Sequence, residues 1–169
     1  MSAPINHAEW LALIDVSGPF LSIPVLDKAY PQGLDVIEPG TAARVRSAYE
    51  EWRESDDDTL HAAWIGFVMS EVLEFESRVL KTDSDIPAAL RHTVAEQGVE
   101  LRPSAALVEP GDSTKARLLV AGWPATQKDL QQAATEDSWA ASPAERMTEL
   151  CRATGVRLGL VTNGEQWLL

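Results

Sequence analysis

The chain has 169 residues, 45% of them hydrophobic, and a formal net charge of −12, so one domain with a substantial core is expected. Neither a membrane span nor a signal peptide is expected, because no apolar run is long enough and the N-terminus lacks a basic region followed by an apolar stretch. The single cysteine, Cys151, excludes an intrachain disulfide and a cysteine-built metal site. These features together favour a cytoplasmic protein.

The negative charge is concentrated in the first half of the chain. Residues 1–77 hold 14 acidic and 4 basic side chains, whereas residues 78–169 hold 12 acidic and 10 basic ones. Because an acidic surface repels phosphate, only the second half is expected to face DNA without a large electrostatic cost. The simpler interpretation is that the acidic side chains keep the fold soluble.

The N-terminal segment is rich in turn signals. A short amphipathic stretch around Trp10 is interrupted by Gly18-Pro19 and by Pro24. Residues 19–40 combine prolines with large apolar side chains. This pattern is typical of an ordered crossing segment rather than of a flexible linker.

Two longer helices are predicted over residues 41–54 and 58–77, where apolar side chains recur at spacings of three and four. Asp56, Asp57 and Asp58 stand at the start of the second helix. Carboxylates are stabilised there by the positive end of the helix dipole. A helix-start role is therefore expected for the triplet, not a metal site.

The pattern changes from helices to strands after residue 82. Strands are predicted over residues 91–96, 99–109 and 115–122, with Pro110-Gly111-Asp112 turning between the last two. Residues 124–141 are rich in Ala, Gln and Thr and are expected to form a loop with a short helix.

A further helix over residues 142–154 is marked at both ends. Ser142 is the expected N-cap, Pro143 takes the first helical position, Glu145 completes a capping box and Gly155 ends the helix. Cys151 faces inward in this helix and is interpreted as a small core residue, because no histidine can be placed near it to activate a thiol.

The chain closes with a predicted strand, an Asn163-Gly164 turn and the opening of a second strand. Asn-Gly between apolar runs predicts a hairpin with a type I′ turn, in which both central residues have a positive φ. Because the second strand is only begun at Leu169, we expect a larger parent protein that continues beyond this residue.

The predicted order is helices, then three strands, then a helix and two strands. This order indicates an α/β fold with a mixed central sheet behind a helical layer. We expect residues 1–82 to form the N-terminal helical layer and residues 83–169 the α/β core, joined in one compact unit.

The second half resembles the PD-(D/E)xK nuclease-like domain at the N-terminus of large restriction-modification proteins, including type I restriction subunits and type IIG or DISARM-like methyltransferases. In that family a strand with Pro-Asp precedes a strand ending in Glu-x-Lys, a helix, and a strand leading into Thr-Asn-Gly and a tryptophan. The counterparts here are Arg102-Pro103-Ser104, residues 118–123, the helix over 142–154 and residues 160–167. The resemblance covers residues 99–169 and implies a restriction-endonuclease-like sheet.

The departures from the family pattern decide the expected chemistry. A nuclease of this type holds Mg²⁺ with two carboxylates and uses a lysine to help activate water. At the matching positions this chain has Ser104, Ala121 and Trp123, which supply none of these groups. The resemblance therefore implies a nuclease-like domain without catalytic residues and without a metal site.

The leading hypothesis is an N-terminal accessory domain of a bacterial DNA methyltransferase in restriction-modification or phage defence. Its role would be to position DNA or to dock the downstream methyltransferase domain or a partner subunit. The chain has neither a Gly-rich loop after its first strand nor an Asn-Pro-Pro-Tyr motif, so S-adenosylmethionine would bind elsewhere in the parent. Candidate DNA contacts are Arg102, Lys115 and Arg117, which ordinary surface charge explains equally well.

Two alternatives remain open. In the first, Glu100, Glu109 or Asp112 converges with a carboxylate of the 58–77 helix and forms a relocated metal site of an active endonuclease. In the second, the chain is a free-standing acidic interaction protein whose charge over residues 1–77 contacts a basic partner.

Overall fold

The computed structural model describes residues 6–15, 22–34, 37–38, 40–55, 57–133 and 139–169. Contacts divide the chain into two units, Met1–Arg44 and Val45–Leu169. The division falls inside the third helix, and the second unit contains the whole of the sheet.

The first unit is built on two short helices, α1 (His7–Leu11) and α2 (Ile23–Ala29). The His7 Nε2 atom lies 2.9 Å from the Tyr30 carbonyl oxygen, and the Trp10 indole N–H donates to His7 Nδ1. Pro24 occupies the first turn of α2, where a helix requires no backbone N–H from that residue. Pro24 therefore lies beyond the stretch around Trp10, which ends with α1, and belongs to a second helix that was not predicted from the sequence.

Helices α3 (Thr41–Arg53) and α4 (Asp58–Phe67) follow, close to the predicted positions. Asp57 is the N-cap of α4 and accepts a hydrogen bond from the Thr59 N–H at 2.8 Å. This confirms the helix-start role for the described members of the aspartate triplet, whereas Asp56 lies outside the described residues.

The second predicted helix ends earlier than residue 77. After α4 the chain continues as a π-helical turn, η1 (Val68–Val72), and Glu74 then adopts a left-handed φ of 53°. The Phe75 N–H donates back to the Met69 carbonyl at 3.0 Å, which satisfies an end carbonyl as a left-handed C-cap does. Apolar periodicity alone gave no signal for this stop.

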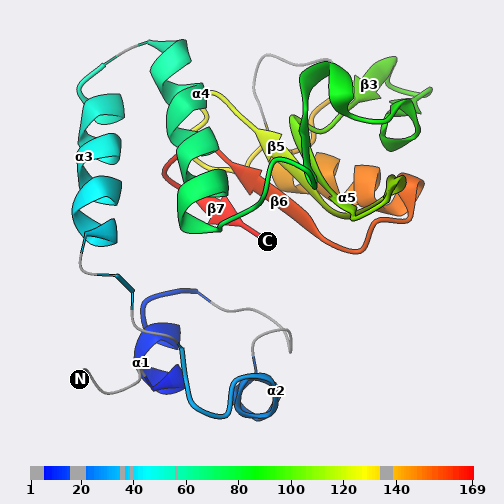
Figure 1. Ribbon diagram of the computed structural model, residues 1–169. Coiled ribbons are helices and arrows are strands. Elements are labelled where there is room, and N and C mark those ends of the chain that lie inside the picture. Colours follow the sequence, from blue (N-terminus) through cyan, green and yellow to red (C-terminus); the bar gives the residue numbers. More distant parts are fainter. Residues whose placement is uncertain (1–5, 16–21, 35–36, 39, 56, 134–138) are drawn as a thin grey trace. The chain divides into compact units, whose positions relative to one another are not determined.

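The central sheet has five strands in the order β1-β4-β5-β6-β7 (Figure 1). The strands are β1 (Leu80–Thr82), β4 (Ala105–Glu109), β5 (Asp112–Gly122), β6 (Gly159–Thr162) and β7 (Trp167–Leu168). Neighbouring strands are antiparallel except β5 and β6, which are parallel and are joined through helix α5 (Pro143–Thr154). The mixed α/β fold predicted from the sequence is confirmed, and β1 was not predicted.

A second, two-stranded sheet pairs β2 (His92–Val94) with β3 (Val99–Leu101). The prediction of one strand over residues 99–109 is therefore wrong, because β3 and β4 belong to different sheets. The break falls at Arg102-Pro103-Ser104, where the buried Pro103 has no N–H to donate to a ladder. Short 3₁₀ turns, η2 (Asp83–Asp85) and η3 (Ala88–Leu90), lead into this sheet.

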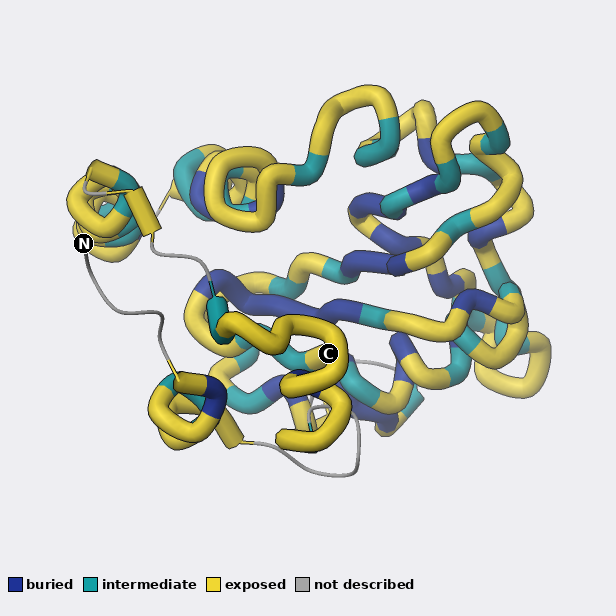
Figure 2. The backbone as a smooth tube through the Cα atoms, turned by 60° about the horizontal axis from the view of Figure 1, so that its bottom comes forward, coloured by how far each residue is buried: buried dark blue, intermediate teal, exposed yellow. Residues whose placement is uncertain are grey.

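The central sheet is covered on both faces. On one face Ala106, Leu119 and Val161 pack with Met147 and Leu150 of α5. On the other face Ala105, Val120 and Leu160 pack with Met69 of η1 and Ile65 of α4. Successive strand residues alternate between these two cores, as the period of a strand requires, and Figure 2 shows the buried backbone concentrated along the central strands.

Helix α5 confirms the predicted end signals. The Ser142 hydroxyl accepts from the Glu145 N–H, the Glu145 carboxylate accepts from the Ser142 N–H, and Gly155 adopts a left-handed φ of 73°. Within residues 124–133 and 139–141 the structure contains no helix, so the short helix expected there is not found in the described part of that loop.

The predicted hairpin at the end of the chain is confirmed, but its turn is not of type I′. Thr162 pairs with Trp167, which leaves a four-residue loop, and only Gly164 has a positive φ, of 90°. The Asn163 side chain instead accepts from the N–H groups of Glu165 and Gln166, at 3.0 and 2.7 Å. A local side-chain turn therefore replaces the backbone turn that Asn-Gly predicts.

Candidate functional site

Ser104, Ala121 and Trp123 lie together at one end of the central sheet. Ser104 directly precedes β4 and Ala121 lies near the end of β5, and the pairing of these antiparallel strands brings the two positions side by side. The Gly122 N–H donates to the Ser104 hydroxyl at 2.9 Å, and the Trp123 N–H donates to the Thr162 carbonyl at 2.8 Å. Three strands thus contribute to this sheet end.

The chemistry at these positions is a hydroxyl, a methyl group and an indole. None of these supplies the charged oxygen ligands that a hard divalent cation prefers. Across the segments that the structure describes, no group of three His, Cys, Asp or Glu side chains is placed to hold a metal ion.

The three carboxylates considered for a relocated site are not brought together. Glu109 and Asp112 face each other across the β4–β5 turn, whereas Glu100 lies in the small sheet. The two facing carboxylates have basic neighbours: Glu109 is 3.6 Å from Arg117, and Asp112 is 3.2 Å from Lys115. Hydrogen bonds from Thr114, and then the Lys115 ammonium, lower the pKa of Asp112.

The candidate DNA contacts also separate into two places. Lys115 and Arg117 lie on β5 near its turn and are engaged by Asp112 and Glu109. Arg102 is exposed at the opposite end of the β4–β5 pair, and it has no hydrogen-bond or ion-pair partner among the described residues. Only Arg102 therefore lies beside the Ser104 end of the sheet.

Arg102 lines a cavity of about 200 Å³ that sequence reasoning missed. Its lining residues are Asp83, Ile86, Arg91, Arg102, Pro103 and Ser104. Arg91 has only an exposed, 4.0 Å ion pair with Glu100. Nothing in the local sequence connects residues 83–91 with residues 102–104, because the contact arises from the path of the chain into the small sheet.

The Thr-Asn-Gly loop packs against α3 and α4. The His61 Nε2 atom donates to the Asn163 carbonyl at 2.9 Å, and the Trp64 indole donates to the Gly164 carbonyl at 2.8 Å. A Cβ atom on Gly164 would lie 2.7 Å from the Trp52 ring. The loop is therefore a fixed junction between the helices and the sheet.

The aromatic cluster around this junction has a structural role. The rings of Trp52 and Trp64 are stacked with their centroids 6.1 Å apart, and Tyr49 contacts both of them edge-on. Trp52 is 4% exposed and Trp64 is 7% exposed. Rings so deeply buried cannot serve as stacking platforms for nucleic-acid bases.

A second buried group ties α5 to the preceding loop. The guanidinium carbon of Arg146 lies 5.5 Å from the Trp123 ring centre and 5.1 Å from that of Trp139. The same guanidinium donates to the carbonyls of Ala141 and Trp139, and Arg146 is 7% exposed. This arginine is therefore part of the core and not a surface contact for phosphate.

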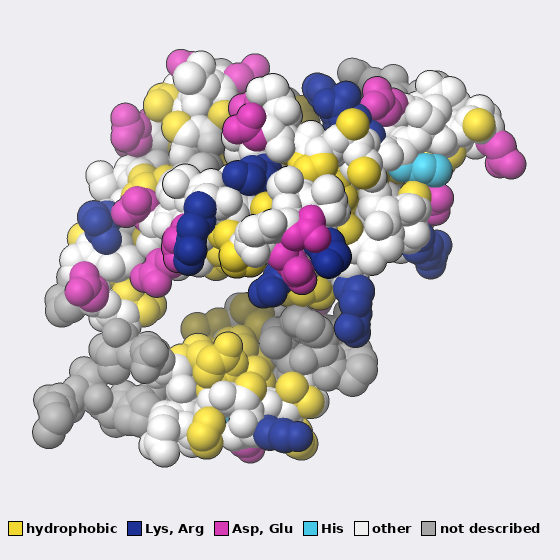
Figure 3. Space-filling model, turned by 45° about the vertical axis from the view of Figure 1, so that its right-hand side comes forward, with side chains coloured by type: hydrophobic (Ala, Val, Ile, Leu, Met, Phe, Trp, Pro, Cys, Tyr) yellow, Lys and Arg dark blue, Asp and Glu magenta, His cyan; other side chains and the backbone are white. Residues whose placement is uncertain are grey.

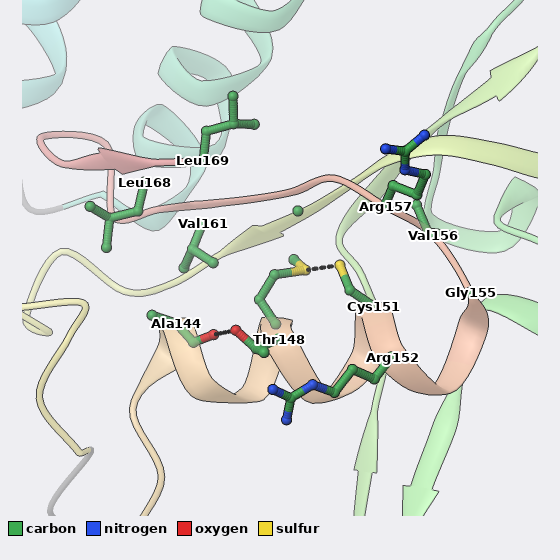
Figure 4. Close-up of a pocket in the computed structure, with 12 residues that line it drawn as sticks. Ala144, Thr148, Cys151, Arg152, Gly155, Val156, Arg157, Val161, Leu168 and Leu169 are labelled. Atoms are coloured by element: carbon green, nitrogen blue, oxygen red, sulfur yellow. Dashed lines mark hydrogen bonds between the residues drawn. The ribbon is translucent and has the colours of Figure 1, made fainter. Parts of the chain in front are cut away.

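A cavity of about 480 Å³ lies between α5 and the strands β6 and β7 (Figure 4). Val161 points from β6 toward the helix, and Cys151 and Met147 lie with their sulfur atoms 3.8 Å apart. Arg152 and Arg157 project away from each other on its two sides. Burial raises the pKa of the Cys151 thiol, which makes it a poor nucleophile at neutral pH.

The surface combines both signs of charge. Figure 3 shows Lys and Arg side chains interspersed with Asp and Glu on the face that it presents.

No family model, curated protein or solved structure matches this chain. No helix in the described ranges has the length and apolar character needed to cross a membrane.

Proposed function

We propose that this chain is an accessory domain that positions DNA for a bacterial S-adenosylmethionine-dependent DNA methyltransferase in restriction-modification or phage defence. The observation that supports this proposal is the meeting of Ser104, Ala121 and Trp123 at one end of a mixed sheet. In the PD-(D/E)xK family that the sequence resembles, the catalytic groups occupy these positions. A restriction-endonuclease-like type of sheet belongs to the same proposal.

The side chains at this sheet end favour binding over cleavage. Ser104 offers a hydroxyl group. Arg102 offers a guanidinium group that has no hydrogen-bond or ion-pair partner among the described residues. Both groups are of kinds that contact phosphate in protein–DNA interfaces. A domain that holds DNA without cutting it would orient the duplex for a methyltransferase domain, or would dock a partner subunit beside it. S-adenosylmethionine would bind to that catalytic domain of the cytoplasmic parent protein.

The alternative is an active metal-dependent endonuclease in which Glu100, Glu109 or Asp112 converges with a carboxylate of the 58–77 helix. Of the three candidates, Glu109 and Asp112 are the two that pair with each other in the sheet. These two carboxylates face each other across a turn, and carboxylate oxygens are ligands that Mg²⁺ prefers. The basic partners of both carboxylates compete with a cation for them, which weighs against this alternative.

One experiment separates the two proposals. The wild-type chain is incubated with supercoiled plasmid in Mg²⁺ or Mn²⁺, and its binding to a short fluorescent duplex is followed by anisotropy at low salt. The accessory-domain proposal predicts measurable duplex binding and an intact plasmid. Nicking that is lost in Glu109→Gln and Asp112→Asn would establish the alternative, and a duplex that does not bind would refute a DNA-positioning role.

A further inference from the structure

We propose that the 200 Å³ cavity beside Ser104 is a phosphate-binding site that holds one phosphate group of a DNA backbone. This inference rests on the proposed DNA-positioning function and names the atoms that would make the contact. The site joins two parts of the chain, because Arg91 follows η3 while Arg102 and Ser104 lie between β3 and β4.

The donors of this site are available to a ligand. Arg102 has no hydrogen-bond or ion-pair partner in the described segments, and the Arg91–Glu100 pair is long and exposed. The Ser104 oxygen accepts from the Gly122 N–H, so the hydroxyl hydrogen is still free to be donated. Two planar guanidiniums and a hydroxyl are a donor set that matches the oxygens of a phosphate.

The cavity fits a phosphate group better than a whole nucleotide. Its volume, about 200 Å³, is below the range of about 300–1,000 Å³ that is typical of sites for drug-sized ligands. Ile86 and Pro103, both buried, form apolar walls.

Asp83 is the one acidic group among the described residues that line the cavity, and it supplies the sharpest test. Its φ of 50° places it in the left-handed region, which asparagine tolerates as readily as aspartate. Asp83→Asn therefore removes a repulsive charge without straining the backbone. The proposed site predicts that this variant binds phosphate more tightly than the wild type does.

The test compares variants R91A, R102A and D83N of the 169-residue chain with R157A. Arg157 is a matched control because it is exposed, has no partner among the described residues and lies far along the sequence on the other cavity. Binding of a short fluorescent duplex is measured as a function of salt. Binding of inorganic phosphate is measured separately, from NMR shifts of the Arg91 and Arg102 side chains and of Ser104.

R102A is expected to weaken duplex binding about tenfold and to lower the salt slope by about one. R91A should act in the same direction, D83N should tighten binding severalfold, and R157A should stay within about twofold of the wild type. Inorganic phosphate should shift the side-chain signals of the wild type but not those of R102A. Arg102→Lys, which keeps the charge but loses the fork, should retain the slope and bind more weakly.

The outcomes also separate this inference from the proposed function. Equal losses in R102A and R157A, with D83N unchanged, would overturn the phosphate site while leaving DNA binding intact. Phosphate-induced shifts without any duplex binding would support the site for a free phosphate or nucleotide and refute its DNA role. The absence of both signals in a folded wild-type protein would overturn the site and the DNA-positioning function together.

Discussion

The junction at Gly164 allows the fold to be tested at a single atom. Gly164→Ala adds a Cβ atom that would lie 2.7 and 2.9 Å from the Trp52 Cη2 and Cζ2 atoms and 3.0 Å from the His61 Nε2 atom. The residue also has a φ of 90°. The substitution therefore combines backbone strain with a clash against a buried ring.

The cost can be worked from these two parts. A side chain held in the left-handed region costs about 1–2 kcal/mol, and forcing an extra carbon into a packed core costs about 1–3 kcal/mol. Gly111 provides the control, because its φ is 85° but no atom lies within 4 Å of the position that a Cβ would take. We expect Gly164→Ala to lower the free energy of unfolding by about 2–5 kcal/mol and Gly111→Ala by only about 1–2 kcal/mol.

Urea unfolding followed by tryptophan fluorescence measures both values, since Trp52 and Trp64 report on the junction itself. The difference between the two variants isolates the close approach of the loop to the Trp52 ring. Equal destabilisation of the two variants would refute the packing of the Thr-Asn-Gly loop against α3 and α4.

Four further predictions concern α5. Ser142→Ala should lower the free energy of unfolding by about 1 kcal/mol, because it removes the N-cap hydroxyl. The Ser142 N–H and hydroxyl lower the pKa of Glu145. The ionised carboxylate therefore stabilises the fold at a pH above the ordinary glutamate pKa of about 4.3, and this stabilisation is lost as the pH falls through the lower pKa of the folded state. The urea midpoints of the wild type and of Glu145→Gln should consequently differ at neutral pH and converge in acid. Arg146→Ala should cost about 3 kcal/mol through lost hydrogen bonds and ring contacts, whereas a loss below about 1 kcal/mol in urea unfolding would contradict its buried role. Native Cys151 should react with iodoacetamide at about pH 8 much more slowly than the unfolded chain does, and equal rates would contradict its burial.

Local signals in the sequence predicted the elements whose formation depends on local chemistry. The capping box joins Ser142 to Glu145, and the helix ends at Gly155, so these signals involve only residues that are close in the sequence. The structure confirms the predicted roles of all three residues. The mixed character of the sheet also followed from the order of strands and helices, because a strand–helix–strand unit gives a parallel pair.

Features that depend on distant contacts were not predictable in the same way. Apolar residues recur through residues 99–109 of the sequence, so the change of sheet at Pro103 was not predicted from it. Asn163 makes a side-chain turn in a loop whose carbonyls also accept hydrogen bonds from His61 and Trp64. The cavity beside Ser104 joins Arg91 to Arg102 through the path of the chain. The spacing of apolar residues in the sequence does not indicate that Arg91 and Arg102 line the same cavity.

The most direct test of DNA positioning without cleavage is the binding of the wild-type chain to a short duplex over a range of salt, with plasmid integrity scored in Mg²⁺. Because the net charge is −12, weak binding is expected, with a Kd on the order of 10⁻⁴–10⁻⁶ M that rises steeply with salt. The account predicts this binding together with an intact plasmid. A nicked plasmid, or a duplex that stays free at low salt, would contradict it.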